Sequence, residues 1–190
     1  MALVAAFPGM TRAGLLREIA QELDAEPEDG LRASVNSYIQ AIQAEITRLN
    51  RRGLKCVLII DEAHFLCANS LNLLRSFGNI ELPDRKLATI LLFGENEFLR
   101  RLEHSSLKDF FGRIFERVEL KPLTRDEVAQ YIKFRCLMAG GGPSLFSNEI
   151  FGEIFRLSGG VPREVNRICR IAMDRAACRG SMRVDLAALE

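Results

Sequence analysis

Two adjacent carboxylates, Asp61 and Glu62, directly follow an apolar run at residues 56–60. In an open α/β sheet, ligands bind beyond the carboxyl ends of the strands, where both side chains would stand. One carboxylate can hold a magnesium ion that also contacts substrate phosphates, and a second can orient or deprotonate the attacking water. This order of residues is the Walker B signature of nucleotide hydrolases. It predicts a metal role for Asp61 and a catalytic role for Glu62.

The usual partner of this signature is a glycine-rich loop that ends in Gly-Lys-Ser/Thr and holds the phosphates. No Gly-Lys pair occurs in the 190 residues. A bare Asp-Glu pair would serve equally well to cap a helix beginning near Ala63, and the apolar run is what favours a present or ancestral nucleotide site. His64 completes the helicase spelling Asp-Glu-Ala-His, but other helicase signatures are absent from the sequence. Both His64 and His104 are therefore interpreted as surface or helix-start residues.

Composition predicts one substantial core with a small appended subdomain. The 26 Lys and Arg nearly balance the 25 Asp and Glu, so overall charge does not indicate a dedicated nucleic-acid or membrane binder. Five cysteines without a Cys-x-x-Cys spacing indicate neither a disulfide framework nor a zinc site, which fits a reducing cytoplasm. The apolar runs are far shorter than the roughly 20 residues of a spanning helix, so we expect no membrane insertion by this chain.

The first part of the chain alternates strands and helices, the pattern of a doubly wound α/β fold. Strands are expected at 1–7, 56–60, 87–94 and 118–120, and the run at 56–60 lacks polar alternation, which predicts cover on both faces. Apolar spacing predicts a first helix through Leu15 and Leu23, and a longer one from Leu31 to Leu49 that Gly53 ends. Further helices are expected at 69–77, 97–102 and 107–111.

The remainder is predicted to be helical, with domains at 1–121 and 122–190. Thr124 and Glu127 have the spacing of a capping box that opens a helix to about residue 138, before a break at 140–143. Ser147 is expected to cap the next helix, which Gly159-Gly160 ends. A third helix is expected from Pro162 to about residue 178, and Asp185 is expected to cap a short final one.

Three further segments carry a resemblance to a known family: Asn79-Ile-Glu-Leu82, Thr89-Ile-Leu-Leu-Phe-Gly94 and Ser158-Gly-Gly-Val-Pro-Arg163. With the Walker B strand, they make the chain similar over essentially its whole length to AAA+ ATPases of the ExeA type. That group includes general secretion pathway A proteins and ATPases that accompany transposases. The resemblance implies a RecA-like core, a parallel sheet flanked by helices, with a C-terminal helical lid. It also implies ATP and Mg²⁺ as ligands, a homo-oligomer and an unidentified protein partner.

The resemblance also implies roles for individual residues. Arg163 would reach the nucleotide from the lid as sensor 2, and Arg113 would reach a neighbouring subunit's site, where it would stabilise charge on the transferred phosphoryl group. Arg117 suits that role less, because it would lie within a strand. The family commonly has Gly-Gln-Pro-Glu after the sensor 1 strand, where this chain has Gly94-Glu-Asn-Glu97. Because an acidic residue would repel phosphate, Asn96 is the expected sensor.

Two alignments of the amino terminus remain open. In the first, residues 1–7 match the family's second strand, so the first strand, phosphate loop and first helix are missing, as expected of a truncated gene, a mis-assigned start codon or a fragment. The family's first strand lies between the sensor 1 strand and the last core strand, so its absence would leave two unpaired edges. In the second, residues 2–7 and Gly9 to Gly14 form a degenerate phosphate loop, with Leu15 and Leu16 replacing Lys and Ser/Thr.

The resemblance implies an ATPase domain that couples ATP binding and hydrolysis to conformational change in a secretion, envelope or transposition machine. The alternative is a non-hydrolysing adaptor or remnant that binds a partner protein or DNA, since a hydrolase without the phosphate-loop lysine loses a source of transition-state stabilisation. A further possibility is DNA binding through the basic cluster Arg48, Arg51, Arg52 and Lys55, whose ordinary role would be a solvated helix end.

Overall fold

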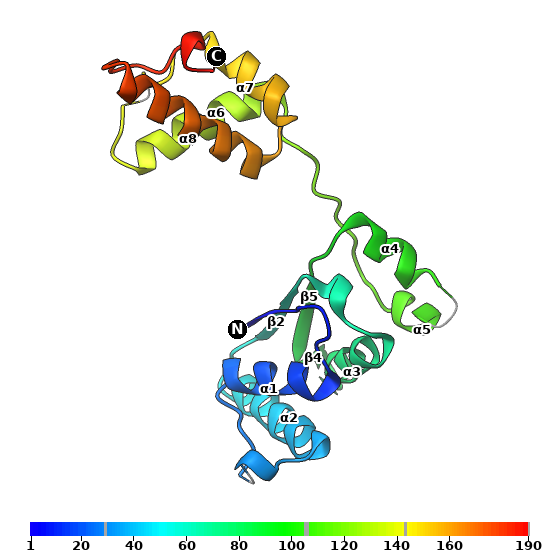
Figure 1. The fold of residues 1–190 in the computed structure, drawn as a ribbon. Coiled ribbons are helices and arrows are strands. Elements are labelled where there is room, and N and C mark those ends of the chain that lie inside the picture. Colours follow the sequence, from blue (N-terminus) through cyan, green and yellow to red (C-terminus); the bar gives the residue numbers. More distant parts are fainter. Residues whose placement is uncertain (29, 105–106, 143, 190) are drawn as a thin grey trace. The chain divides into compact units, whose positions relative to one another are not determined.

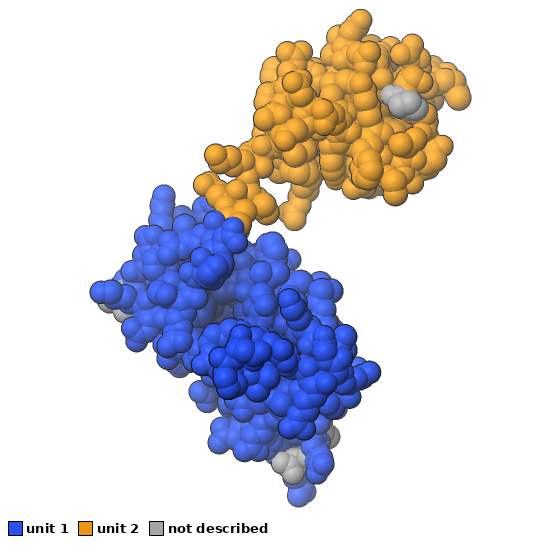
Figure 2. Space-filling model, turned by 180° about the vertical axis from the view of Figure 1, so that it is seen from behind, with its two compact units in different colours: residues 1–117 blue, residues 118–190 orange. Residues whose placement is uncertain are grey.

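The computed structural model describes residues 1–28, 30–104, 107–142 and 144–189. The chain forms two compact units, Met1–Arg117 and Val118–Glu190 (Figure 2). The first unit combines a parallel sheet with helices, and the second is helical (Figure 1). Within the described residues, no helix has the length and apolar character needed to cross a membrane.

The sheet of the first unit has three parallel strands in the order β1-β2-β5. They are β1 (Ala2–Ala5), β2 (Cys56–Asp61) and β5 (Ala88–Leu92). In register, Val4 lies beside Ile60, which in turn lies beside Leu92. A separate antiparallel hairpin joins β3 (Glu81–Leu82) to β4 (Arg85–Lys86). The expected strands at 1–7, 56–60 and 87–94 are thus confirmed: the first and last are shorter than expected, and β2 extends one residue further, to Asp61.

The two longer N-terminal helices of this unit begin at residues whose side chains cap them. They are α1 (Arg12–Glu22), α2 (Val35–Arg51), α3 (Ala68–Gly78), α4 (Asn96–Leu102) and α5 (Lys108–Phe111), with short 3₁₀ helices η1 (Gly30–Arg32) and η2 (Ala63–Phe65). The Thr11 hydroxyl accepts a hydrogen bond from the Gly14 amide at the start of α1. The expected start of the second helix at Leu31 is wrong, because Ser34 caps α2 by accepting from the Ser37 amide.

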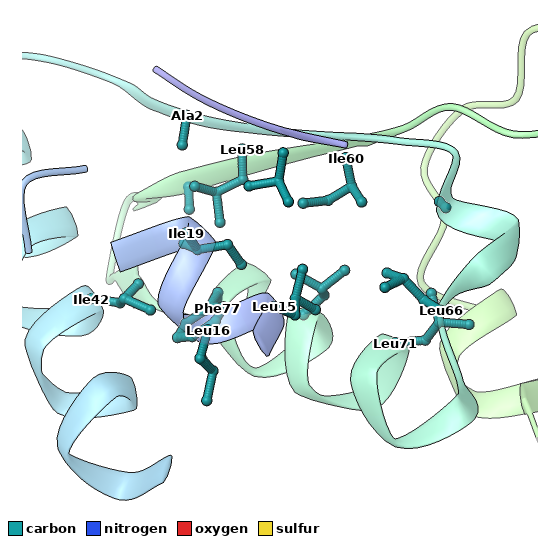
Figure 3. Close-up of a cluster of buried hydrophobic side chains, with 14 of the residues drawn as sticks. Ala2, Leu15, Leu16, Ile19, Ile42, Leu58, Ile60, Leu66, Leu71 and Phe77 are labelled. Atoms are coloured by element: carbon teal, nitrogen blue, oxygen red, sulfur yellow. The ribbon is translucent and has the colours of Figure 1, made fainter. Parts of the chain in front are cut away.

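The core lies between one face of the sheet and helices α1, α2 and α3. Ala2, Leu58 and Ile60 point from the strands toward Leu15 and Ile19 of α1 (Figure 3). Side chains from the other helices close this layer: Ile42, Leu71 and Phe77, all fully buried. Burying each large apolar side chain contributes about 1.5–3 kcal/mol before chain entropy is subtracted. This packing fixes the position of β2 through the side chains on the face that meets the helices.

Within the first unit, the described helices do not cover the opposite face of the sheet. Leu3, Leu91 and Phe93 are half-exposed, and Val57 and Ile59 of β2 are only partly buried. The expectation that the strand at 56–60 is covered on both faces is therefore wrong. Its continuous apolar composition favours burial on both sides, but among the described residues of the first unit the helices pack against one side only.

The expected strand at 118–120 is not formed. Val118 and Leu120 are 74% and 80% exposed, and their backbone has no strand assignment. A strand needs a neighbour that satisfies its N–H and C=O groups. Among the described residues, no strand pairs with the outer edge of β5, so the segment at 118–120 has no ladder to join.

The second unit packs three helices around a small core. They are α6 (Arg125–Met138), α7 (Ile150–Ser158) and α8 (Pro162–Cys178), followed by a 3₁₀ helix η4 (Leu186–Ala188). Val128, Ile150, Ile154 and Val165 are fully buried where these helices meet. The capping box is confirmed: the Thr124 hydroxyl accepts from the Glu127 amide, and the Glu127 carboxylate accepts from the Thr124 amide.

Two details of this unit differ from expectation. Ser147 does not cap α7, which begins at Ile150 with Glu149 at its N-cap. The Ser147 amide instead donates to the Val184 carbonyl, which places Ser147 in a contact between distant segments. Asp185 occupies the N-cap position of η4 without a capping hydrogen bond. Of the expected break at 140–143, Pro143 lies outside the described residues.

Candidate active site

Asp61 stands at the carboxyl end of β2, on the sheet face that the described helices leave uncovered. Its carbonyl accepts a hydrogen bond from the Ala6 amide at 2.9 Å, which ties it to the segment after β1. Its carboxylate oxygen Oδ1 accepts from the Glu62 amide at 2.9 Å. The side chain is exposed, and Oδ2 has no hydrogen-bond donor among the described residues. One oxygen of Asp61 is thus held by the protein while the other can meet a ligand.

Glu62 has a left-handed backbone, with φ 53° and ψ 34°. This conformation is uncommon for a residue other than Gly, Asn or Asp, and it costs of order 1–3 kcal/mol. The surrounding hydrogen bonds hold it: the Ala63 amide donates to the Phe93 carbonyl at 2.7 Å, and the Phe93 amide donates to the Ile60 carbonyl at 2.9 Å. The end of β5 therefore fixes the turn that carries Glu62. Such strain is concentrated at functional sites.

The imidazole of His64 lies against the Glu62 carboxylate. His64 Nδ1 is 3.3 Å from Glu62 Oε2, and the side chains are 17% and 51% exposed. Nδ1 is buried and forms no hydrogen bond with the described residues. The ring also contacts Phe65, with centroids 4.0 Å apart. This proximity is not among the sequence-based expectations, although Asp-Glu-Ala-His was a signal for it.

Helix α4, which carries Asn96, begins beside the same turn. Gly94 precedes it, and a Cβ at Gly94 would lie 3.0 Å from the Phe98 ring and 3.5 Å from the His64 amide nitrogen. The absence of a side chain thus permits β5 to end close to η2. Glu95 occupies the N-cap position without a capping hydrogen bond, and Asn96 is the exposed first residue of α4.

Arg113 lies away from this turn. Its Nη1 donates to Asn79 Oδ1 at 2.9 Å. Asn79 caps the far end of α3, and an 11-residue helix is roughly 16 Å long. The structure therefore does not bring Arg113 to the Asp61–Glu62 turn of its own chain. Arg117, the other candidate, places its guanidinium 3.8 Å from the centroid of the Phe111 ring.

Arg163 belongs to the second unit, at the start of α8. It is exposed and makes no hydrogen bond or ion pair with the described residues. The two glycines that precede it are required by the local backbone conformation. Gly159 ends α7 with φ +58°, and Gly160 has φ +76° with a hypothetical Cβ only 2.0 Å from the Leu123 carbonyl oxygen. The Leu123 amide donates to the Gly160 carbonyl at 2.9 Å, so this junction holds the segment before α6.

Comparison with known proteins identifies the family. Residues 1–102 match the family described as AAA domain. This chain belongs to the AAA domain family. Over 179 residues it is 31% identical to general secretion pathway protein A of Aeromonas hydrophila, an alignment covering 93% of this chain and 32% of that protein. This AAA domain thus spans about a third of the relative's length and is ExeA-like.

Solved structures agree with this fold. Cdc6p from Pyrobaculum aerophilum has a TM-score of 0.69 and 20% identity, covering 96% of this chain and 49% of that one. The RuvB Holliday junction branch migration motor of Thermotoga maritima has a TM-score of 0.54 and 22% identity, covering 99% and 59%. The expected RecA-like AAA+ fold is confirmed.

The donor set of this AAA domain would need ligands from outside the protein to hold a metal ion. Among the described residues, no group of three or more His, Cys, Asp or Glu could hold a metal ion by itself. Mg²⁺ usually binds one or two carboxylates and completes its shell with phosphate oxygens and water. Asp61, with one oxygen open to solvent, suits that arrangement.

The degenerate phosphate loop at Gly9 to Gly14 is contradicted. Helix α1 already begins at Arg12, and the Gly14 amide donates to the Thr11 hydroxyl, so it is not offered to a phosphate. Leu15 and Leu16 are fully buried in the core. In addition, β1 pairs with β2 and not with β5, whereas a first AAA strand would lie beside the sensor 1 strand, β5. The strand order fits the alignment with the family's second strand.

The basic cluster at the end of α2 is partly neutralised. Arg48 donates to both carboxylate oxygens of Glu45, from Nε at 2.6 Å and from Nη2 at 2.8 Å. This hydrogen-bonded guanidinium lowers the pKa of the Glu45 carboxyl below its usual value. Arg85 approaches from β4 and donates to Asn50 Oδ1 at 3.3 Å. Glu45 therefore offsets the charge of Arg48, whereas Arg85 adds a positive charge beside the cluster.

Proposed function

We propose that this AAA domain supplies the Walker B, sensor and lid portions of an ATP-binding and ATP-hydrolysing machine. The observation that carries the proposal is the end of β2, where Ile60 and Ala63, on either side of Asp61 and the strained Glu62, are hydrogen-bonded to Phe93 after β5. The relative with 31% identity, a general secretion pathway protein, favours a process in secretion or the cell envelope over transposition.

Each candidate residue has a distinct task in this proposal. Asp61 directs its open oxygen at the Mg²⁺ of a bound nucleotide, where the metal would neutralise phosphate charge. Glu62 would orient the attacking water through its carboxylate, which is half-exposed. Asn96, at the start of α4, senses the γ-phosphate through its amide. Arg163 acts from the lid.

Arg113 is proposed to act on a neighbouring subunit of a homo-oligomer. What supports this role is its exposure and its separation from the Asp61–Glu62 turn of its own chain. In that case the hydrogen bond from Arg113 to Asn79 must break when subunits assemble, because the same guanidinium would have to reach the neighbouring subunit's nucleotide.

The test is a titration with a fluorescent ATP analogue, with and without Mg²⁺, while thermal unfolding is followed. Magnesium-dependent binding that raises the melting temperature, and that Asp61→Asn removes, supports the proposal. In a chain with its phosphate loop restored, Glu62→Gln should retain binding and abolish turnover. Equal loss of binding in both variants would contradict the separate roles of the two carboxylates.

A second candidate function is a non-hydrolysing adaptor that keeps the AAA scaffold to bind a partner protein. The specific observation in its favour is the burial of Leu15 and Leu16, together with a sequence that has no Gly-Lys pair. Cooperative unfolding without any effect of nucleotide or Mg²⁺ in the same titration would favour this candidate.

A further inference from the structure

Arg101 of α4 contacts the backbone of the turn that carries Glu62. Its Nη1 donates to the His64 carbonyl at 2.6 Å, and its Nη2 donates to the Leu66 carbonyl at 2.7 Å. The donor and acceptors are 37 and 35 residues apart in sequence. The same guanidinium lies 5.1 Å from the centroid of the Phe98 ring, one turn earlier on α4. A planar fork thus joins two carbonyls that no other described group bridges.

These carbonyls need such a donor. Helix η2 spans only Ala63–Phe65, so the carbonyls at its end have no further turn of helix to bond. A cation at a helix C-terminus is favourable, and Arg holds two acceptors in a fixed geometry that Lys cannot reproduce. Arg101 therefore satisfies both oxygens at once and fixes the direction of the η2 backbone.

The contact reaches Glu62 through His64. Arg101 holds the His64 carbonyl, and the buried His64 Nδ1 lies 3.3 Å from Glu62 Oε2. On the other side, the Ala63 amide is bonded to the Phe93 carbonyl. We propose that Arg101 is a positioning residue that keeps the Glu62 turn in its left-handed conformation and the His64 ring against the carboxylate. That Glu62 acts on water rests on the proposed function, whereas the backbone clamp does not.

The test compares Arg101→Ala, Arg101→Lys and a matched control, Arg100→Ala. Arg100 is exposed on the same helix and makes no hydrogen bond or ion pair with the described residues. Without nucleotide, NMR would follow amide exchange at Ala63, the Glu62 amide shift and the His64 Cε1–H shift. Arg101→Ala should speed Ala63 exchange about tenfold and shift both resonances, because two charge-assisted hydrogen bonds are lost. Arg101→Lys should give an intermediate change.

A second readout separates positioning from general destabilisation. In the nucleotide titration, Arg101→Ala should retain Mg²⁺-dependent binding, as Glu62→Gln does, and melting without ligand should shift by only a few degrees. Resonances and exchange identical to those of Arg100→Ala would overturn the proposal, as would full retention of the wild-type values in Arg101→Lys. A failure of wild-type nucleotide binding would count against the proposed function alone, since the NMR comparison needs no ligand.

Discussion

At the scale of single residues, the strained backbone of Glu62 makes a measurable prediction. Glu62→Gly should be more stable than Glu62→Ala by about 1 kcal/mol, because glycine adopts φ +53° without the Cβ penalty, a gain only partly offset by its greater unfolded-state entropy. Urea unfolding of both variants measures the difference. At Glu97, inside helix α4, the order should invert, since alanine is the better helix former. The same order at both positions would contradict the strain.

Thiol reactivity at neutral pH should also differ between individual cysteines. A hydrogen bond with the Ser70 hydroxyl lowers the pKa of Cys67, at the N-cap of α3, whereas burial raises the pKa of Cys169 to about 12. Cys67 should therefore react with iodoacetamide far ahead of Cys169, because the thiolate is the nucleophile. Peptide mass spectrometry over time gives both rates. Ser70→Ala should slow the reaction of Cys67 with iodoacetamide about threefold. The rate at Cys178 should not change, so it serves as an internal standard.

The sequence predicts the site residues that are contiguous, and it does not predict those that depend on contacts between distant segments. Asp61 and Glu62 are visible because an apolar run and two acids are contiguous. The roles of His64 and Arg101 are not, because they depend on contacts made when α4 packs beside η2, and Arg101 bonds a carbonyl 37 residues away. A left-handed Glu62 is equally hidden, since no local propensity favours it and tertiary hydrogen bonds impose it.

At the scale of elements, a helix start set by a local capping motif is easier to predict than a strand that needs a partner. The capping box of α6 is a local motif, and Thr124 and Glu127 satisfy one another whatever surrounds them. The segment at 118–120 has strand-like alternation, but a strand forms only against a partner, which the described residues do not offer at the outer edge of β5. The nearly continuous apolar run of β2 likewise does not predict which of the two faces of the strand is covered.

The junction between α7 and α8 gives a prediction with an internal control. Gly160→Ala would place a Cβ 2.0 Å from the Leu123 carbonyl oxygen, whereas Gly159→Ala meets nothing within 4 Å. Gly159→Ala should cost about 1 kcal/mol for its left-handed backbone, and Gly160→Ala about 3 kcal/mol or more. Denaturant unfolding of the full chain measures both. Equal costs would mean that the Leu123 contact does not hold this junction.

The capping box predicts a pH dependence of the second unit. Hydrogen bonds from the Thr124 amide and hydroxyl lower the pKa of Glu127 in the folded state. A depressed carboxyl pKa contributes stability that is present above the ordinary value of about 4.3 and is lost as pH falls through the folded value. The stability difference between wild type and Glu127→Gln should therefore be largest above about pH 5 and shrink in acid. Unfolding at a series of pH values checks this, and a constant difference would contradict it.

At the scale of the whole molecule, the uncovered sheet face of the first unit should govern solution behaviour. Leu3, Ile59 and Leu91 lie side by side on it in register. Leu3 and Leu91 are about half-exposed, and contiguous exposed apolar surface favours association. The pair Leu3→Thr and Leu91→Thr should reduce concentration-dependent association at a cost of at most about 1 kcal/mol each, because threonine suits a strand and little buried area is lost.

The matched control for that pair is Leu58→Thr. Leu58 lies on the opposite face of β2, where it is fully buried against the helices, so the same change should cost about 3 kcal/mol or more. Sedimentation velocity at several concentrations measures association, and urea unfolding measures stability. If the outer-face pair destabilises the chain as much as Leu58→Thr, that face must be covered in solution. If it leaves association unchanged, the exposed leucines are not what brings copies of the chain together.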